Sequence, residues 1–435
     1  MSRFLAPLLL VAASLTGCAV NPVTGKSELS LLSESDEIDI GTQQYLPMRQ
    51  AQGGDYVVDP ELTRYVNEIG TRLAQASDRP HLPFEFVVLN NSVPNAWALP
   101  GGKIAINRGL LIELENEAEL AAVLGHEITH ATARHGAKAV ERNLLLQTGV
   151  AVVTLGTALA TGREDRAALV GAGAALGAML VSQKYGRDAE LEADYYGMRY
   201  MARAGYDPQG AVTLQEKFVK LFEGRKTGWL EGLFASHPPS RERVAANRKT
   251  AAALHTPDGI LGKERYEQRI ATLIRSRDGY RAYDEALAAL QASDFDKAEA
   301  LAKRALAVEP REALFHGLLG DIAFVRHKPE QAIRHYSDAI DRNREYFYFW
   351  LSRGLAYRTM RDNARARLDL ARSLELLPTA DAHEALGYIA LESNEREAAV
   401  EHFRIAATSD SPAGQRARQA LERLGVNPSP TPTGR

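Results

Sequence analysis

The apolar positions along this chain of 435 residues predict a mostly helical protein with a small amount of β-structure. One helix is expected over residues 59–76, because four apolar residues recur there at spacings of four, three and four. These residues are Leu62, Val66, Ile69 and Leu73. Another helix is expected over 33–50, where Ser33 is suited to be the N-cap and the first turn is acidic.

Two short strands and two further helices are expected next. Residues 84–89 read FEFVVL, an aromatic and β-branched run typical of a strand. Residues 103–107 alternate after a Gly-Gly turn, which is typical of a half-buried strand. A long helix is expected over 117–139, and another over 185–203.

Two apolar stretches separate these last two helices. Residues 144–160 and 167–181 are rich in Gly, Ala and Thr. As helices each would be roughly 23–26 Å long, which is shorter than the ~30 Å hydrocarbon core of a bilayer. A packed or surface-apposed helical hairpin is therefore favoured over a transmembrane hairpin.

The last third of the chain contains a repeat. Small residues recur in register at spacings of 34, 34 and 33 residues. The three columns are Ala286, Gly320, Gly354 and Gly387; Ala298, Ala332, Ala366 and Ala399; and Ala305, Ala339, Ser373 and Ala406. Small residues let two antiparallel helices approach closely, and such pairs stack to bury their apolar faces. The segment 279–412 resembles four tetratricopeptide (TPR) repeats, and a helix over 413–424 would cap them.

Composition and charge narrow the class of protein. A net charge of −3 gives no indication of nucleic-acid binding. The single cysteine, Cys18, follows an apolar segment that begins with Arg3, the pattern of a signal peptide. The sequence Leu15-Thr16-Gly17-Cys18 resembles a bacterial lipobox. That resemblance implies cleavage before Cys18 and lipid attachment to it, and Ala19 favours the outer membrane.

The strongest chemical motif is HEITH, at residues 126–130. On a helix, His126 and His130 lie about 40° apart around the axis, so both imidazoles can hold one metal ion. Glu127 is placed to act as general base on water at that ion. These are the parts of a zinc-dependent hydrolase.

A zinc site that keeps one position open for water needs a third protein ligand. His135 would lie about 180° round a continuous helix, on the opposite face, and the HExxHxxGxxH pattern fails at Gly136. Glu190 and Asp194, four residues apart, are better placed: Glu190 can bind zinc, while Asp194 accepts a hydrogen bond from the outer nitrogen of a ligand histidine.

Taken together, these motifs resemble the gluzincin metallopeptidases, the family that includes HtpX and the CAAX prenyl proteases. Residues 95–102, NAWALPGG, look like the NAxxxPGG segment of that family, RGLL at 108–111 also fits, and ELEAD at 190–194 looks like its ExEAD motif. With the repeats and the signal sequence, the chain is similar to BepA-type periplasmic proteases. The lipobox is more like that of shorter lipoprotein members of the family.

The resemblance implies roles for residues 236–243, SHPPSRER. His237 would lie near the metal, either binding the oxyanion of the tetrahedral intermediate or ligating zinc as a fourth ligand that keeps the enzyme latent. Arg243 would assist the oxyanion or brace the loop. The strand over 103–107 is a candidate for the edge that pairs with an extended substrate.

The expected fold is α+β and mostly α: a zincin-like metallopeptidase domain with a small β-sheet, followed by an all-α TPR solenoid. The expected segments are a signal peptide (1–17), a tether (18–32), the peptidase domain (33–255), a connector (256–278), the TPR domain (279–424) and a disordered tail (425–435). The expected cofactor is one zinc ion per chain.

The expected function is that of an endopeptidase anchored to the outer membrane and facing the periplasm. By resemblance its partners are misfolded or misassembled outer-membrane proteins and their assembly machinery. The alternatives are a lipid-anchored TPR scaffold or chaperone with a latent peptidase site, and an integral-membrane protease if residues 144–181 span a bilayer.

Overall fold

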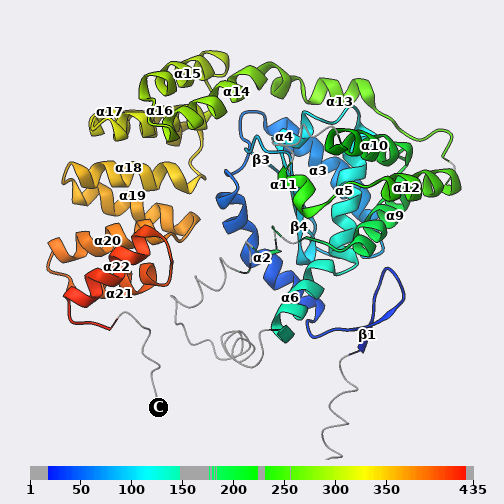
Figure 1. The fold of residues 1–435 in the computed structure, drawn as a ribbon, viewed down its shortest axis with the longest axis horizontal. Helices are drawn as coiled ribbons and strands as arrows, with labels where there is room; N and C mark the ends of the chain where they lie inside the picture. The colour runs from blue at the N-terminus through cyan, green and yellow to red at the C-terminus, as the bar shows by residue number, and fades with distance from the viewer. Residues whose placement is uncertain are drawn as a thin grey trace, which may run out of the picture.

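The computed structural model describes residues 18–146, 176, 179, 180, 182, 184–223, 231–254 and 256–427. Figure 1 shows two units side by side: a unit of helices around a small sheet, called the peptidase unit here after the expectation above, and an arc of paired helices. The expected signal peptide, most of the apolar hairpin over 144–181 and the tail after residue 427 lie outside the described residues. None of the described helices is both long and apolar enough to cross a membrane.

The segment expected to be a tether is packed against the peptidase unit. Strand β1 (Cys18–Val20) pairs antiparallel with β2 (Ser27–Leu29). The Asn21 side chain donates a hydrogen bond to the carbonyl of Ala133 at 3.1 Å. The backbone N–H groups of Leu31 and Leu32 both donate to Glu141, each at 2.9 Å.

The sheet of the peptidase unit has three strands: β3 (Glu85–Leu89), β4 (Ala96–Leu99) and β5 (Lys103–Asn107). Their order is β3-β5-β4, with β3 parallel and β4 antiparallel to β5. The expectation that 103–107 forms an edge is therefore wrong. The Gly101-Gly102 turn, with φ of 74° and 86°, folds β4 back along β5 and leaves β4 at the edge.

Nine helices of this unit have both of their bounds within the described residues. They are α2 (Glu34–Ala51), α3 (Pro60–Gln75), α4 (Arg108–Leu111), α5 (Glu117–Thr132), α6 (His135–Leu146), α9 (Arg187–Arg203), α10 (Gln209–Glu223), α11 (Glu231–Ser236) and α12 (Arg241–Leu254). Ser33 caps α2 through a capping box with Asp36, as the sequence predicts. The four apolar residues predicted to face inward from α3 are each at most 1% exposed.

The long helix expected over 117–139 is two helices. α5 ends at Thr132, and Arg134 adopts a left-handed conformation with φ of 63° before α6 begins at His135. The Arg134 guanidinium forms an ion pair with buried Glu37 of α2. The apolar pattern continues through the break, so periodicity alone could not locate it; a tertiary ion pair helps hold the turn.

Helices α5 and α9 cross unusually closely, and this crossing positions the site. A Cβ atom on Gly197 would lie 2.8 Å from the carbonyl carbon of Gly125, so neither helix tolerates a side chain at this point. Gly125 directly precedes His126, whereas Gly197 lies two turns after Glu190. The crossing therefore brings the HEITH motif and the acidic motif together.

The C-terminal unit is an array of antiparallel helix pairs. After α13 (Lys263–Arg269), the helices are α14 (Ala271–Gln291), α15 (Phe295–Val308), α16 (Ala313–Val325), α17 (Pro329–Arg342), α18 (Phe347–Thr359), α19 (Asn363–Leu376), α20 (Ala380–Glu392), α21 (Arg396–Ala407) and α22 (Pro412–Arg423). The second and third small-residue columns are 0% exposed throughout. A Cβ on Gly320 would lie 2.5 Å from the ring of Tyr336. The predicted α+β fold with a helical solenoid is confirmed.

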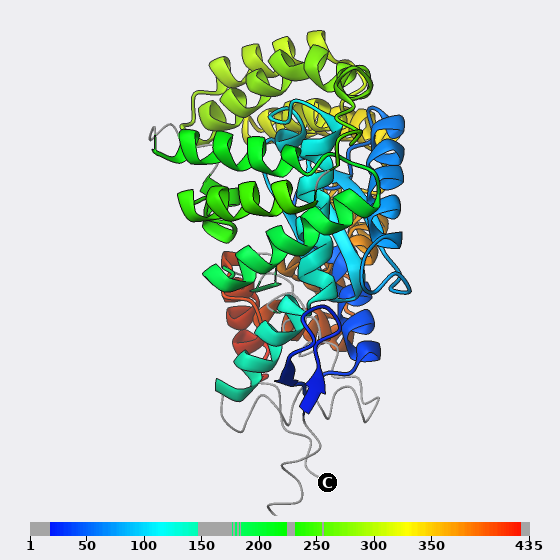
Figure 2. The same ribbon diagram turned by 90° about the vertical axis from the view of Figure 1, so that its right-hand side faces the viewer.

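Buried polar contacts fix the repeats to the peptidase unit. Arg108 is 2% exposed, and its guanidinium carbon lies 3.4 Å from the ring centroid of Tyr280 in the first repeat. Asn90 donates to Glu312 at 3.0 Å. Further along the array, between α17 and α18, the carbonyl of Glu345 accepts a hydrogen bond from Gln50 of α2 at 2.6 Å. In the view turned by 90°, α9, α10 and α12 lie in front and the repeats behind them (Figure 2).

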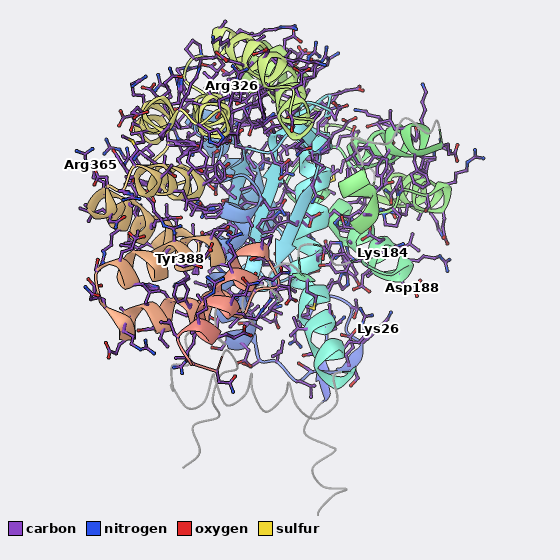
Figure 3. All side chains as sticks on the ribbon, turned by 60° about the vertical axis from the view of Figure 1, so that its left-hand side comes forward. Lys26, Lys184, Asp188, Arg326, Arg365 and Tyr388 are labelled. Carbon is purple, nitrogen blue, oxygen red and sulfur yellow. The ribbon has the colours of Figure 1, made fainter. Side chains whose placement is uncertain are left out.

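The start of α9 faces away from the repeats. Figure 3 shows Lys184 and Asp188 on one flank of the molecule and Arg365 of the array on the opposite flank. Tyr185 and Glu190, which contribute to the site described below, belong to the same segment as Lys184 and Asp188.

Candidate metal and catalytic site

Four side chains from three segments converge at one point. His126 and His130 come from α5, Glu190 from the first turn of α9, and His237 follows the end of α11. One nitrogen or oxygen atom from each lies within 4.8 Å of all the others. These are the residues that the sequence suggested as three ligands and a possible fourth.

The distances suit a tetrahedral metal ion. His126 Nε2 lies 3.0 Å from His130 Nε2 and 3.2 Å from His237 Nδ1. Glu190 Oε1 lies 3.0 Å from His237 Nδ1 and 3.4 Å from His130 Nε2. Zinc–nitrogen bonds of 2.0–2.1 Å in a tetrahedron place neighbouring donor atoms about 3.3 Å apart. Three imidazole nitrogens that face one another cannot all be paired by hydrogen bonds, so a shared cation accounts for the cluster better.

Asp194 and Arg243 contact the outer atoms of two of these ligands, His126 and Glu190. Asp194 Oδ1 lies 2.9 Å from His126 Nδ1, the nitrogen that faces away from the other donors. Arg243 donates to both oxygens of Asp194, at 2.7 Å each, and its Nη1 lies 2.7 Å from Glu190 Oε2. Arg243 therefore orients two carboxylates: that of Glu190, which belongs to the cluster, and that of Asp194, which in turn orients His126.

The charge around the cluster favours a cation. Burial lowers the pKa of His126, but the carboxylates of Glu190 and Asp194 outweigh it and raise this pKa to about 10. Burial also lowers the pKa of His130 well below its usual value. Burial raises the pKa of Asp194, whereas Arg243 and His126 lower it to about 2. Since the carboxylates stabilise positive charge at His126, the same residues fit a divalent metal ion.

Glu127 lies beside the cluster without belonging to it. Its side chain is 3% exposed, and its Oε2 atom has no hydrogen-bond partner within the described part of the chain. Its Oε1 atom lies 3.7 Å from His237 Nε2. Burial raises the pKa of Glu127, although His237 and His126 oppose this. A buried carboxylate with a raised pKa and a free oxygen is well suited to accept a proton.

The break between α5 and α6 changes the surroundings of His130. His135 begins the second helix, and its Nδ1 lies 2.9 Å from His130 Nδ1, the nitrogen that faces away from the cluster. The argument that placed His135 on the opposite face of a continuous helix is therefore wrong, although its side chain still does not join the four donors. Its Nε2 lies 3.2 Å from Glu192.

Sequence analysis missed Tyr185. Its ring stacks on His130, with centroids 3.9 Å apart and planes at 24°, and lies 5.7 Å from the ring of His237. Tyr185 stands two residues before the start of α9, where no spacing rule distinguishes it from other residues that precede a helix. Cys18 belongs to strand β1.

The site combines a buried helix that carries two histidines and a glutamate with a third ligand, a carboxylate, from a crossing helix. Together with the attached helical solenoid, this site defines a metallopeptidase with TPR repeats. The comparison with family models agrees. Peptidase family M48 matches residues 60–251, and the tetratricopeptide repeat matches 283–346, 323–381 and 351–415. The chain belongs to the M48 family of zinc metallopeptidases.

Among curated proteins, the chain is 30% identical over 345 residues to the Beta-barrel assembly-enhancing protease of Escherichia coli (strain K12), covering 74% of this chain and 69% of that one. It is 33% identical over 165 residues to the Mitochondrial metalloendopeptidase OMA1 of Arabidopsis thaliana, covering 37% of this chain and 30% of that one. It is 27% identical over 269 residues to the Metalloprotease YcaL of Escherichia coli (strain K12), covering 58% and 98%.

Proposed function

We propose that this chain is a zinc-dependent endopeptidase that degrades misfolded or misassembled outer-membrane proteins in the periplasm. The observation that carries the proposal is the convergence of His126, His130 and Glu190 beside the buried carboxylate of Glu127. One relative is named Beta-barrel assembly-enhancing protease, and this name supports outer-membrane proteins as the substrate class. TPR repeats bind protein ligands on extended surfaces, so the array would dock substrates or the assembly machinery.

The residues of the site divide the work of peptide hydrolysis. One zinc ion per chain, held by His126, His130 and Glu190, would polarise the peptide carbonyl and lower the pKa of water. Glu127 takes the proton from the attacking water and delivers it to the nitrogen of the leaving amine. Arg243 acts as a positioning residue, because both Asp194 and Glu190 already occupy its guanidinium.

Removal of the metal tests the proposed function. Treating the purified chain with EDTA is expected to abolish cleavage of unfolded casein, and an equivalent of zinc is expected to restore it, because these ligands need a cation between them. The measurement is peptide release, with zinc content determined in the same samples. Cleavage that persists in zinc-free protein would rule out a zinc peptidase.

Two roles for His237 follow from its position. Its Nδ1 lies 3.2 Å from His126 Nε2 and 3.0 Å from Glu190 Oε1, close to the separation of two ligand atoms on one zinc ion, which favours the fourth-ligand role. Its Nε2 faces Glu127. A fourth protein ligand would occupy the position that a catalytic zinc keeps open for water. Such an arrangement would keep the peptidase latent until a substrate displaces His237. The other role, donation to an oxyanion, requires His237 to have left the metal.

A His237→Ala variant is expected to raise the rate of casein cleavage about tenfold. This factor corresponds to a wild type in which His237 is displaced from the metal in about one molecule in ten. The rate should be compared at equal zinc content. A fall in the rate of similar size would instead support donation to the oxyanion, the second role.

A second candidate function, a scaffold or chaperone, is favoured by the same four-donor arrangement, because a permanently closed site would hold substrate without cutting it. The two candidates differ in one result. A scaffold binds zinc and unfolded protein but remains inactive in both the wild type and the His237→Ala variant.

Strand β4 is the proposed place for the substrate backbone. It is an edge strand of the sheet and packs on α5, which carries the HEITH motif. An extended peptide that adds to such an edge is recognised by its backbone, which suits unfolded substrates of varied sequence.

Attachment to the outer membrane through lipid on Cys18 is part of the proposal. A Cys18→Ser variant is expected to move from the membrane fraction to the soluble periplasmic fraction, since one residue carries the lipid. The measurement is fractionation with carbonate extraction, with Ser27→Ala as a control that should stay with the membrane. Membrane retention of Cys18→Ser would support a spanning role for residues 144–181.

A further inference from the structure

A basic pocket lies against the metal site and takes no part in the chemistry described so far. Three cations line it: Lys138 and Arg142 of α6, and Lys184 of the segment that leads into α9. Arg142 and Lys184 are exposed, and Lys138 is half-buried. The described residues that line this basic pocket include no carboxylate. A concave surface with this charge attracts an anionic group.

Three carboxylates belong to neighbouring segments but do not line the basic pocket. Glu28 of β2 pairs with Lys138 at 2.7 Å, and Glu192 lies 3.2 Å from His135 Nε2. Asp188 stands in the first turn of α9. Because none of the three is part of the lining, the surface that an occupant meets is positive.

Two further residues of the lining connect the basic pocket to the metal site. The Tyr185 ring stacks on His130, with centroids 3.9 Å apart, and His135 Nδ1 lies 2.9 Å from His130 Nδ1. Both Tyr185 and His135 line the basic pocket. An occupant therefore lies one ring beyond a metal ligand, which is within reach of a peptide held at the metal. This position favours a group of the substrate over a membrane headgroup.

The edge strand β4 indicates which part of the substrate arrives there. Its first residue, Ala96, lines a hollow together with Glu127. Its last residue is followed by Pro100, which packs on α6: a Cβ on Gly136 would lie 3.4 Å from the Pro100 ring. Strand β4 therefore leads from Glu127 toward the helix that supplies two of the three cations.

We propose that the basic pocket binds the side-chain carboxylate of an aspartate or glutamate that precedes the cleaved bond. In the reaction proposed above, Glu127 gives a proton to the amine nitrogen, so the residue after the bond lies on the Glu127 side. The residues before the bond then extend along β4 toward α6. An extended chain advances about 3.3 Å per residue, which places the acidic residue about two to four positions before the bond.

This inference rests on the proposed peptidase function and names a class of substrate for it. Acidic segments of unfolded proteins are cleaved in preference to basic ones. Because two of the three cations are exposed, the preference is moderate and is screened by salt.

Mapping the cleavage sites in a mixed library of synthetic peptides by mass spectrometry tests the basic pocket. At low ionic strength, Asp and Glu are expected about tenfold more often than Lys and Arg at these positions before the bond, relative to their frequency. The preference is expected to disappear at about 0.5 M NaCl. Cleavage without any charge preference at low ionic strength would overturn the inference while leaving the peptidase function intact.

Reversing the charge of the pocket gives a result that misfolding cannot produce. A chain with both Arg142→Glu and Lys184→Glu is expected to prefer Lys and Arg at the same positions, at unchanged zinc content. The matched control is Lys249→Glu, the same change of charge at an exposed position of α12. It should keep the preference of the wild type. A double variant that still prefers acidic residues would overturn the inference.

A binding measurement separates this inference from the peptidase proposal. The probes are a labelled Ala/Gly peptide with two Glu residues and the same peptide with two Lys residues, added to the zinc-loaded chain with Glu127→Gln. Tighter binding of the Glu peptide that the double variant loses would support the basic pocket, even if the chain cuts nothing. Equal binding of the two peptides would overturn it. Binding of vesicles that contain phosphatidylglycerol, lost in the double variant while both peptides bind equally, would assign the cations to a membrane surface instead.

Discussion

Replacing Glu127 by glutamine is expected to lower the rate of peptide cleavage by about 10²–10⁴-fold while zinc content stays at the wild-type value. Glutamine keeps the shape of the side chain but cannot accept the proton of the attacking water. Glu127 is not among the four converging donors, so the metal site should persist. The measurement is casein cleavage beside metal analysis of the same protein.

The control for this prediction is Glu115→Gln, which changes a carboxylate whose side chain is 70% exposed. That variant should cleave casein at the wild-type rate. Loss of zinc in Glu127→Gln would mean that Glu127 supports the metal site itself. An unchanged rate of cleavage would remove it from the mechanism.

Replacing Arg243 by alanine is expected to lower the free energy of unfolding by about 3–5 kcal/mol, because it leaves two buried carboxylates without their cation. Asp194 and Glu190 are 7% and 1% exposed, and each lies 2.7 Å from the guanidinium. The measurement is urea unfolding of metal-free protein, where no zinc can substitute for the lost charge. Arg243→Lys should recover only part of the stability, since lysine cannot make the two parallel bonds to Asp194.

An exposed ion pair supplies the control. Arg248 pairs with Glu216 at 2.8 Å, but its side chain is 66% exposed. Arg248→Ala should therefore change the free energy of unfolding by at most about 1 kcal/mol. If Arg243→Ala lowers the free energy of unfolding by no more than this, Arg243 does not stabilise the buried network, contrary to what its geometry indicates.

The pH dependence expected from the Asp194 carboxyl agrees with a stabilising role of Arg243. Its pKa is depressed to about 2 in the fold from an ordinary value near 3.8, chiefly through Arg243 once burial is offset. A depressed carboxyl pKa stabilises the fold above the ordinary value, and that stability is lost as the pH falls from about 4 to 2. The acid sensitivity of the domain should therefore diminish in the Arg243→Ala variant.

The sequence alone determined the features that are local or strictly periodic. The repeats were predictable because small residues must recur where antiparallel helices touch, and the three columns are visible at a fixed spacing. The two histidines of HEITH were predictable as neighbours because a helix places residues four apart on one face. The capping of α2 by Ser33 is local for the same reason.

The tertiary structure alone decided the features that depend on contacts between distant segments. The apolar pattern predicted one helix where an ion pair between Arg134 and Glu37 holds a break. The sequence pattern predicted strands at β3 and β5 but none at β4, and it is β4 that forms the edge beside β5. Only close packing of helices brings His237 and Tyr185 to the two histidines, because segments distant in sequence meet only when the chain folds.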